Sequence, residues 1–249
     1  MENETGKPVM KQEKEVQEFS FDPWGPGNYL IKLRNGEDVS LKPHNKYLFL
    51  AKDMTDILYT RPEVAELFPD VFENPSLPVV MEIGCYMGDT VVELAGQNPD
   101  FNIMGVDIKY KRVVKSCNKI KRAKLRNARI VIADARELIA VLPDESLFGI
   151  LAFFPDPWQK KKQAKHRFLN HRFFQTAAKK LKAGGFIWVK TDDRPYVEEV
   201  SERAKEFHFL LEDRLPLERP LIGANHRTFF EQLFTRLQQP IYQLYIRKG

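Results

Sequence analysis

Three carboxylates stand near the ends of successive apolar segments of the chain. Glu82 lies in the segment VVMEIG, which runs into a loop that contains Gly84 and Gly88. Asp107 is the last residue but one of the segment FNIMGVDI, 23 residues after Gly84, and Asp134 ends the segment ARIVIAD. A carboxylate placed like Asp107 suits the two hydroxyls of a ribose, and glycine lets a ligand approach the backbone closely. This spacing predicts a site for a nucleoside cofactor, with Asp134 near the edge of its base.

The loop after Glu82 narrows the choice of cofactor. The dinucleotide-binding fingerprint needs glycine at the positions that Tyr86 and Asp89 occupy, and the chain contains no phosphate-binding P-loop. An acidic Glu82 repels phosphates, whereas it suits a ligand that carries an ammonium group and a sulfonium. The residues therefore favour S-adenosyl-L-methionine over NAD. Gly84 and Gly88 alone are also compatible with an ordinary strand-to-helix turn, so this prediction depends on the carboxylates.

A second group of chemically useful side chains follows the fourth apolar segment, in the run FFPDPW and the lysines after it. Two prolines restrict the backbone around Asp156, and Trp158 offers a surface on which a base can stack. The following lysines can bind phosphates. Beside a cofactor site, this composition predicts a loop that modifies a nucleotide. The alternative is a proline-braced turn followed by the solvated start of a helix.

Positive charge is concentrated in two runs of the chain. Residues 109–126 and residues 158–182 each hold nine Lys or Arg and no acid, in a chain whose formal net charge is +5. Two such patches suit a polyanion such as RNA. From charge alone, two solvated helix faces balanced by acids elsewhere explain them equally well.

The apolar segments alternate with helical patterns from residue 79 onward. Strands that alternate with helices form a mainly parallel sheet with helices on both faces, and such sheets bind ligands at the carboxyl ends of their strands. We therefore predict an α/β, doubly wound, Rossmann-like fold whose site is formed by the residues just after each strand. The predicted strands are 79–84, 101–108, 128–134, 147–154, 186–192 and 240–248, and the predicted helices are 88–97, 110–126, 135–141, one ending at 181, and 195–206.

The part of the chain before this pattern is predicted to be separate from it. Residues 1–18 are polar and are predicted to be disordered. Residues 19–75 are predicted to form an N-terminal extension with a hairpin turn at Asn35-Gly36 and a helix within residues 46–70. Residues 76–249 are predicted to form the S-adenosylmethionine-dependent domain.

Composition excludes several classes of protein. No apolar run approaches the length of a membrane span, and the N-terminus lacks the apolar core of a signal peptide. Two cysteines, Cys85 and Cys117, favour a reducing, cytoplasmic setting over a disulfide framework. The five histidines lack the spacing of a metal site, so neither a metal nor a membrane is an expected partner.

Several motifs together resemble one family. FFPDPW followed by lysines resembles the signature of the tRNA (guanine-N7-)-methyltransferases. The EIG loop, the acid that ends the second strand, the pair Asp134-Ala135 and the T-D-x-x-P-Y run at residues 191–196 match that family in order. Thr228-Phe229-Phe230-Glu231 resembles its T-x-[FY]-E element, and the resemblance covers residues 79–248. It implies a seven-stranded methyltransferase sheet and transfer of a methyl group to N7 of a guanine in the variable loop of tRNA, by a monomer or homodimer.

The resemblance also implies a role for each matching residue. Asp156 is implied to be the acidic residue at the reaction centre, and Glu82, Asp107 and Asp134 are implied to contact S-adenosylmethionine with the loop of Gly84 and Gly88. The residues implied to contact the guanosine substrate are Lys160, Asp192, Thr228, Phe229, Phe230 and Glu231, and those implied to contact the tRNA backbone are Lys162, Lys165, His166 and Arg167. The spacing of Thr228 and Glu231 also fits a helix capping box, and Asp192-Asp193 also fits a helix N-cap.

Two departures from the family pattern leave rival functions open. Tyr86 stands where the family usually has glycine, and Gln159 stands where it usually has proline. One rival is a non-catalytic, RNA-binding relative on the same scaffold, which Tyr86 favours and the retained carboxylates oppose. The other is a methyltransferase that acts on a different RNA position, because the proline-aromatic loop is also reminiscent of amino-group methyltransferases.

Overall fold

The protein is described by a computed structural model in which residues 30–32, 38–40, 46–158, 161–214, 221 and 227–249 are described. The chain forms two compact units, residues 1–53 and residues 54–249. None of the described helices combines the length and the apolar character that crossing a bilayer requires. The predicted disordered tail, residues 1–18, lies outside the described residues.

The first unit contains a small antiparallel pair of strands. β1 (Leu30–Lys32) pairs with β2 (Asp38–Ser40), with Leu30 opposite Ser40. The Asn35-Gly36 turn predicted between them falls outside the described part of the chain. After it come helix α1 (Lys46–Ala51) and a single 3-10 turn, η1 (Lys52–Met54).

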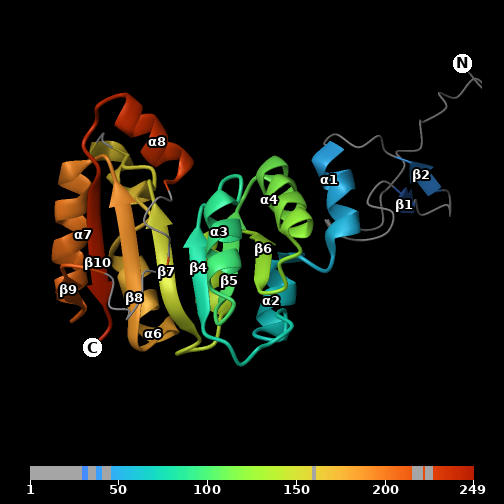
Figure 1. Ribbon diagram of the computed structural model, residues 1–249, viewed down its shortest axis with the longest axis horizontal. Helices are drawn as coiled ribbons and strands as arrows, with labels where there is room; N and C mark the ends of the chain where they lie inside the picture. Colours follow the sequence, from blue (N-terminus) through green and yellow to red (C-terminus); the bar gives the residue numbers. More distant parts are fainter. Residues whose placement is uncertain (1–29, 33–37, 41–45, 159–160, 215–220, 222–226) are drawn as a thin grey trace, which may run out of the picture. The chain divides into compact units, whose positions relative to one another are not determined.

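The second unit is built on one eight-stranded sheet in the order β3-β6-β5-β4-β7-β8-β10-β9 (Figure 1). The strands from β3 to β8 pair in parallel, and β10 pairs antiparallel with both β8 and β9. The strands are β3 (Leu58–Thr60), β4 (Val79–Ile83), β5 (Asn102–Asp107), β6 (Ala128–Ile132), β7 (Leu147–Phe153), β8 (Leu181–Thr191), β9 (Leu210–Glu212) and β10 (Tyr242–Arg247).

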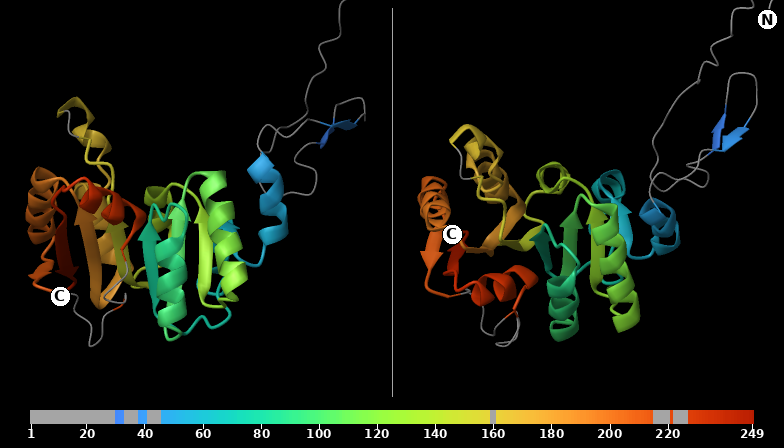
Figure 2. Two further views of the ribbon diagram at one scale, coloured as in Figure 1. Left: turned by 45° about the horizontal axis from the view of Figure 1, so that its top comes forward. Right: turned by 90° about the horizontal axis from the view of Figure 1, so that it is seen from above.

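The central strands are apolar on both faces because helices cover both faces of the sheet. Every residue of β4 and of β5 is buried, as is typical of central strands in a parallel sheet. Helices α3 and α4 pack on one face, while α2, α5, α6 and α7 lie on the other (Figure 2). These helices are α2 (Arg61–Leu67), α3 (Asp89–Gln97), α4 (Tyr110–Ala123), α5 (Ala135–Val141), α6 (His171–Lys180) and α7 (Arg194–Glu206); η2 (Lys161–His166) precedes α6.

The predicted doubly wound α/β class is confirmed, and the sheet has eight strands where the family resemblance implied seven and the sequence pattern located six. The two strands that the pattern missed are β3 and β9, at opposite edges of the sheet, and each has three residues, too few to show a periodic pattern in the sequence. β3 pairs with β6, so residues 58–60, which precede the predicted boundary at 76, take part in the large sheet. The division of the chain into a tail, an extension and a methyltransferase domain stays a prediction. A last helix, α8 (Phe229–Arg236), lies near the carboxyl ends of β7 and β8 (Figure 1).

Candidate active site

The loop after β4 turns through a series of left-handed backbone conformations. The φ angles of Gly84, Tyr86 and Gly88 are 69°, 50° and 72°. A Cβ atom added at Gly88 would lie 2.6 Å from the Cβ of Ser116, so only glycine lets the start of α3 pack this closely against α4. No atom lies within 4 Å of a Cβ added at Gly84, so the backbone there is open to a ligand. The loop therefore presents main chain to the space beyond the sheet.

That space is a cleft of about 460 Å³ at the carboxyl ends of β4, β5, β6 and β7. Asp107, Asp134 and Asp156 all line it. One oxygen of the buried Asp107 accepts a hydrogen bond from the backbone N–H of Lys109 at 2.9 Å, and the other lies 3.3 Å from the guanidinium of Arg112. Each carboxylate oxygen can accept a further hydrogen bond, so Asp107 can still bind hydroxyl groups in the cleft.

Asp134 has a structural contact as well as a place in the cleft. Its side chain caps α5 by accepting a hydrogen bond from the backbone N–H of Arg136 at 2.8 Å. The Asp134 side chain is 37% exposed, and the Arg136 guanidinium lies 3.7 Å from it. Asp134 is therefore held at the rim of the cleft rather than deep inside it.

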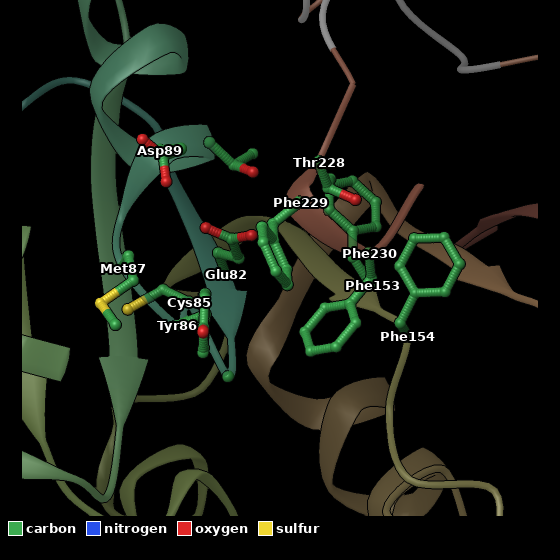
Figure 3. Close-up of a pocket in the computed structure, with 12 residues that line it drawn as sticks. Glu82, Cys85, Tyr86, Met87, Asp89, Phe153, Phe154, Thr228, Phe229 and Phe230 are labelled. Carbon is green, nitrogen blue, oxygen red and sulfur yellow. The ribbon is translucent and has the colours of Figure 1, made fainter. Parts of the chain in front are cut away.

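Glu82 lies in a separate small chamber of about 30 Å³ beside the cleft (Figure 3). Its Oε2 atom is buried and has no hydrogen-bond partner in the described residues. Burial raises the pKa of Glu82 to about 8, a hydrogen bond from Thr90 opposes this shift, and the nearby charges of Asp89 and Asp107 add to it. The chamber has room for a group of the size of an ammonium ion, and the orphaned oxygen lacks the positive hydrogen-bond donor that such a group supplies.

The cleft and the chamber share one wall. Gly84, Tyr86, Phe153, Phe154 and Phe230 line both of them. A ligand with a nucleoside in the cleft and an ammonium group beside Glu82 would therefore pass along the open backbone of Gly84. The carboxylates of Asp107 and Glu82 at the two ends of this route, and the open backbone of Gly84 between them, fit S-adenosylmethionine.

The loop after β7 carries the predicted reactive acid. Asp156 is exposed at the mouth of the cleft, and Trp158 stands beside it with its ring centroid 5.6 Å from that of His166. Phe154 and Trp158 have positive φ angles of 52° and 44°. The guanidinium of Arg167 donates a hydrogen bond to the carbonyl of Pro157 at 2.7 Å, so it braces this strained loop from below.

α8 brings the predicted substrate element to the same site. Thr228 and Glu231 form a capping box, in which the backbone N–H of Glu231 donates to the Thr228 hydroxyl at 3.1 Å. The Glu231 carboxylate also accepts a hydrogen bond from the buried Lys190 ammonium at 2.8 Å. Lys190 in turn lies 5.2 Å from the ring centroid of Phe153 and 4.9 Å from that of Trp188. Because Glu231 is engaged on two sides, it holds α8 in place over the end of β8.

The structure brings most of the predicted site residues to one edge of the sheet. Glu82, Thr228, Phe229 and Phe230 line the chamber, and the residues that line the cleft include Gly84, Asp107, Asp134, Asp156, His166 and Phe230. Lys162 and Lys165 are exposed on η2.

The other described residues predicted for the site line neither cavity, namely Gly88, Lys162, Lys165, Arg167, Asp192 and Glu231. Lys160 lies outside the described residues. Asp192 is half-buried after β8 and lines neither cavity, and its neighbour Asp193 is the N-cap of α7. Arg167 points inward, where it forms an ion pair with Glu199 and lies 5.3 Å from the ring centroid of Tyr196. The contacts of Lys160, Asp192 and Arg167 with RNA stay predictions.

Comparison with known proteins agrees with this geometry. Residues 76–244 match the family model described as "Putative methyltransferase". A tRNA (guanine-N(7)-)-methyltransferase of Actinobacillus succinogenes is 34% identical over 187 residues, which are 73% of this chain and 74% of that protein. The enzyme of the same name from Pasteurella multocida is 35% identical over 189 residues, 73% of this chain and 71% of that protein.

The chain belongs to the tRNA (guanine-N7-)-methyltransferase family. A further member, from Syntrophotalea carbinolica, is 38% identical over 151 residues, and the match spans 60% of this chain and 64% of that protein's length. Beyond the family, a solved aminoglycoside resistance methyltransferase superposes with a TM-score of 0.51 at 16% identity, over 77% of this chain and 94% of its own. An antibiotic-related methyltransferase gives a TM-score of 0.50 at 17% identity, over 76% and 93%. These two likenesses show the fold alone.

Two partner residues, Arg112 and Lys190, and one contact, between Tyr86 and Phe229, were not predicted from the sequence. Arg112 pairs with Asp107, Lys190 pairs with Glu231, and Tyr86 contacts Phe229. Arg112 is one of nine basic residues in the run 109–126, and nothing in that run distinguishes it from the others. Lys190 directly precedes Thr191 and Asp192, which belong to the family motif. Among the described residues, no three His, Cys, Asp or Glu side chains gather as metal ligands would.

Proposed function

We propose that the protein transfers a methyl group from S-adenosylmethionine to N7 of a guanine in tRNA, in the variable loop of that RNA. One observation carries the proposal. Asp107, Asp134 and Asp156 open onto a single cleft, and this cleft shares a wall with the chamber of the unpartnered Glu82. Carboxylates for a nucleoside cofactor and an acid for the substrate thus meet in one place. The names of the family members support the same activity.

The cofactor would be held mainly by buried acceptors. Asp107 would bind the ribose hydroxyls, Asp134 would lie near the adenine edge, and Glu82 would pair with the ammonium group. When bound, S-adenosylmethionine supplies an electrophilic methyl group on a positively charged sulfur. The open backbone at Gly84 leaves space for that part of the cofactor.

The substrate residues would align and stabilise the base rather than deprotonate it. Guanine N7 has a free lone pair at neutral pH, so the reaction needs no strong base at that atom. Asp156 at the mouth of the cleft would accept hydrogen bonds from N1–H and the exocyclic amine, and so stabilise the positive charge that develops on the purine. Phe230 and Trp158 line the same cleft and offer faces on which the base can stack. Lys162 and Lys165 would bind the RNA backbone.

The proposal also covers the partners, the location and the oligomeric state of the enzyme. The partner is tRNA, with neither a membrane nor a metal as a further partner, and the enzyme acts in the cytoplasm as a monomer or homodimer. The division into a tail (1–18), an extension (19–75) and a methyltransferase domain (76–249) is part of the proposal, with β3 of the extension adding a strand to the sheet of that domain.

The test is a methyl-transfer assay with nucleoside analysis. Unmodified tRNA is incubated with the full chain and S-adenosylmethionine that carries an isotopically labelled methyl group, and the RNA is then digested and separated by mass spectrometry. Label in N7-methylguanosine is the expected result. Label in an amino-methylated base would mean a different target atom. Binding of tRNA without any transfer of label would instead favour a non-catalytic RNA-binding protein.

A further inference from the structure

Tyr86 adopts a backbone conformation that a side chain makes unfavourable. Its φ angle is 50°, between the positive φ angles of Gly84 and Gly88 in the same loop. An L-residue other than glycine, Asn or Asp seldom occupies this region, and strain of this kind persists where surrounding contacts compensate for it. The contacts of the Tyr86 ring should therefore show which interactions compensate for the strained backbone.

The Tyr86 ring packs against α8 rather than against its own loop. Its centroid lies 5.4 Å from that of Phe229 with an interplanar angle of 28°, and 5.6 Å from that of Phe230. On the same ring, the guanidinium of Arg112 lies 4.8 Å from the centroid. Aromatic and cation–π contacts at these distances are attractive, so the ring joins three separate elements.

Within the part of the chain that the structure describes, α8 has few other contacts that hold it. None of its residues is buried, and Phe229 is 51% exposed. Apart from the Tyr86 stack, its described contacts include the Lys190–Glu231 ion pair and the rings of Phe154 and Phe234, whose centroids are 5.3 Å apart. Loss of one of so few contacts should loosen the whole helix.

Arg112 extends this set of contacts to the cofactor carboxylate. The same guanidinium that lies over Tyr86 is 3.3 Å from Asp107. The carboxylate proposed to bind ribose and the helix proposed to bind guanosine are therefore linked through two side chains, Arg112 and Tyr86.

We propose that Tyr86 is a positioning residue that fastens α8, with Thr228 and Glu231, to the cofactor loop. The role of α8 in binding substrate rests on the proposed function. The role of Tyr86 in holding α8 in place does not. Glycine at this position would relieve the backbone strain and would also remove the ring that holds α8.

Hydrogen–deuterium exchange of the full chain tests the coupling directly. In Tyr86→Gly, the amides of α8 should exchange roughly tenfold faster than in the parent protein, since one or two aromatic contacts are lost. Tyr86→Phe should keep the parent rate because it keeps the ring. Phe229→Ala should reproduce the effect of Tyr86→Gly from the other side, and the double variant should exchange no faster than either single variant. Leu237→Ala, at the exposed end of α8, and the amides of β4 serve as controls.

Methylation kinetics then show whether the position of α8 matters to the substrate. Tyr86→Gly should raise the KM for tRNA severalfold, with a smaller change in kcat, and Tyr86→Phe should restore it. Unchanged exchange of α8 in Tyr86→Gly would overturn the proposal, as would equal acceleration in Tyr86→Gly and Tyr86→Phe. If the parent protein transfers no methyl group, the proposed function fails, but the exchange rates still decide the role of Tyr86.

Discussion

The cofactor end and the substrate end of the cleft differ in how far their side chains are exposed to solvent. At the cofactor end, Glu82 and Asp107 have only 5% and 4% of their surface exposed. At the substrate end, Asp156 is exposed, and 51% of Phe229 is exposed. The first end buries two of its three carboxyl groups, with Asp134 at its rim, while the second leaves Asp156 and Phe229 open to solvent.

Burial makes the cofactor end ready for its ligand. A buried carboxylate is held by few well-defined partners, as the backbone N–H of Lys109 and the guanidinium of Arg112 hold Asp107. Electrostatic attraction is also stronger away from water, so a small charged cofactor gains more from each contact. The exposed substrate end suits a macromolecule, because RNA must reach it from outside and will itself exclude water from Asp156 on binding.

The sharpest way to break this comparison is to remove the charge of Asp156. In Asp156→Asn, we expect kcat to fall roughly 100- to 1000-fold, because a group that stabilises the developing charge is lost. The Kd of S-adenosylmethionine, measured by calorimetry, should not change, because Asp156 belongs to the substrate end.

Asp144→Asn is the matched control for that experiment. Asp144 is an exposed acid paired with Lys180, before β7 and so at the opposite edge of the sheet. Its substitution should leave kcat unchanged. Full activity of Asp156→Asn would contradict the proposed role of that acid.

Substitution of Asp107 tests the cofactor end of the cleft, where we expect cofactor binding to change and tRNA binding to stay the same. In Asp107→Asn, the Kd of S-adenosylmethionine should rise roughly 10- to 100-fold, since hydrogen bonds to a buried charged acceptor are lost. The affinity for tRNA, measured by filter binding without cofactor, should stay the same. Loss of tRNA affinity in this variant would mean that the two ends are not separate binding sites.

The contrast between the two ends also explains what the sequence could predict. Glu82, Asp107 and Asp134 lie at or just after the ends of strands whose apolar pattern is local, so their meeting at one edge is a consequence of parallel topology. The Rossmann-like class followed from the same pattern. The short strand β3 did not, because three residues carry no periodic signal.

The side-chain contacts at the substrate end join residues that are far apart in the sequence, so no local sequence pattern predicts them. The spacing of Thr228 and Glu231 predicted a capping box, and the structure contains it. Nothing in that spacing shows that Glu231 would meet Lys190, 41 residues away, or that Tyr86 would stack on Phe229. Such side chains meet only once β8, α8 and the glycine loop have been brought together by the fold.

The burial of Glu82 predicts an unusual dependence of stability on pH. The pKa of Glu82 is about 8 in the folded protein against an ordinary value of 4.5. Between pH 6 and 7 the folded state therefore keeps a proton that the unfolded state has lost, so this group should lower the free energy of unfolding by about 1.4 kcal/mol per pH unit as the pH rises. Glu82→Gln removes this contribution.

Urea denaturation at pH 6 and pH 7 measures the effect. Relative to the parent protein, Glu82→Gln should gain about 1.4 kcal/mol between the two values. The same pH dependence in both proteins would show that the Glu82 carboxylate is not held in its protonated form, and the electrostatic contrast between the two ends would then be smaller than the structure indicates.

The smallest expected effect concerns the exposed lysines of η2. Lys162→Ala and Lys165→Ala should each weaken tRNA binding severalfold and lower the slope of log Kd against log salt concentration by about 1, because each removes one phosphate contact. Lys182→Ala is the control, since Lys182 is equally exposed but lies in the first residues of β8, at the amino-terminal edge of the sheet. An equal loss for Lys182→Ala would mean that RNA is held by net charge rather than by the edge that carries the cleft. A change confined to Lys162 and Lys165 would place the RNA backbone next to Asp156, where an exposed substrate end needs it.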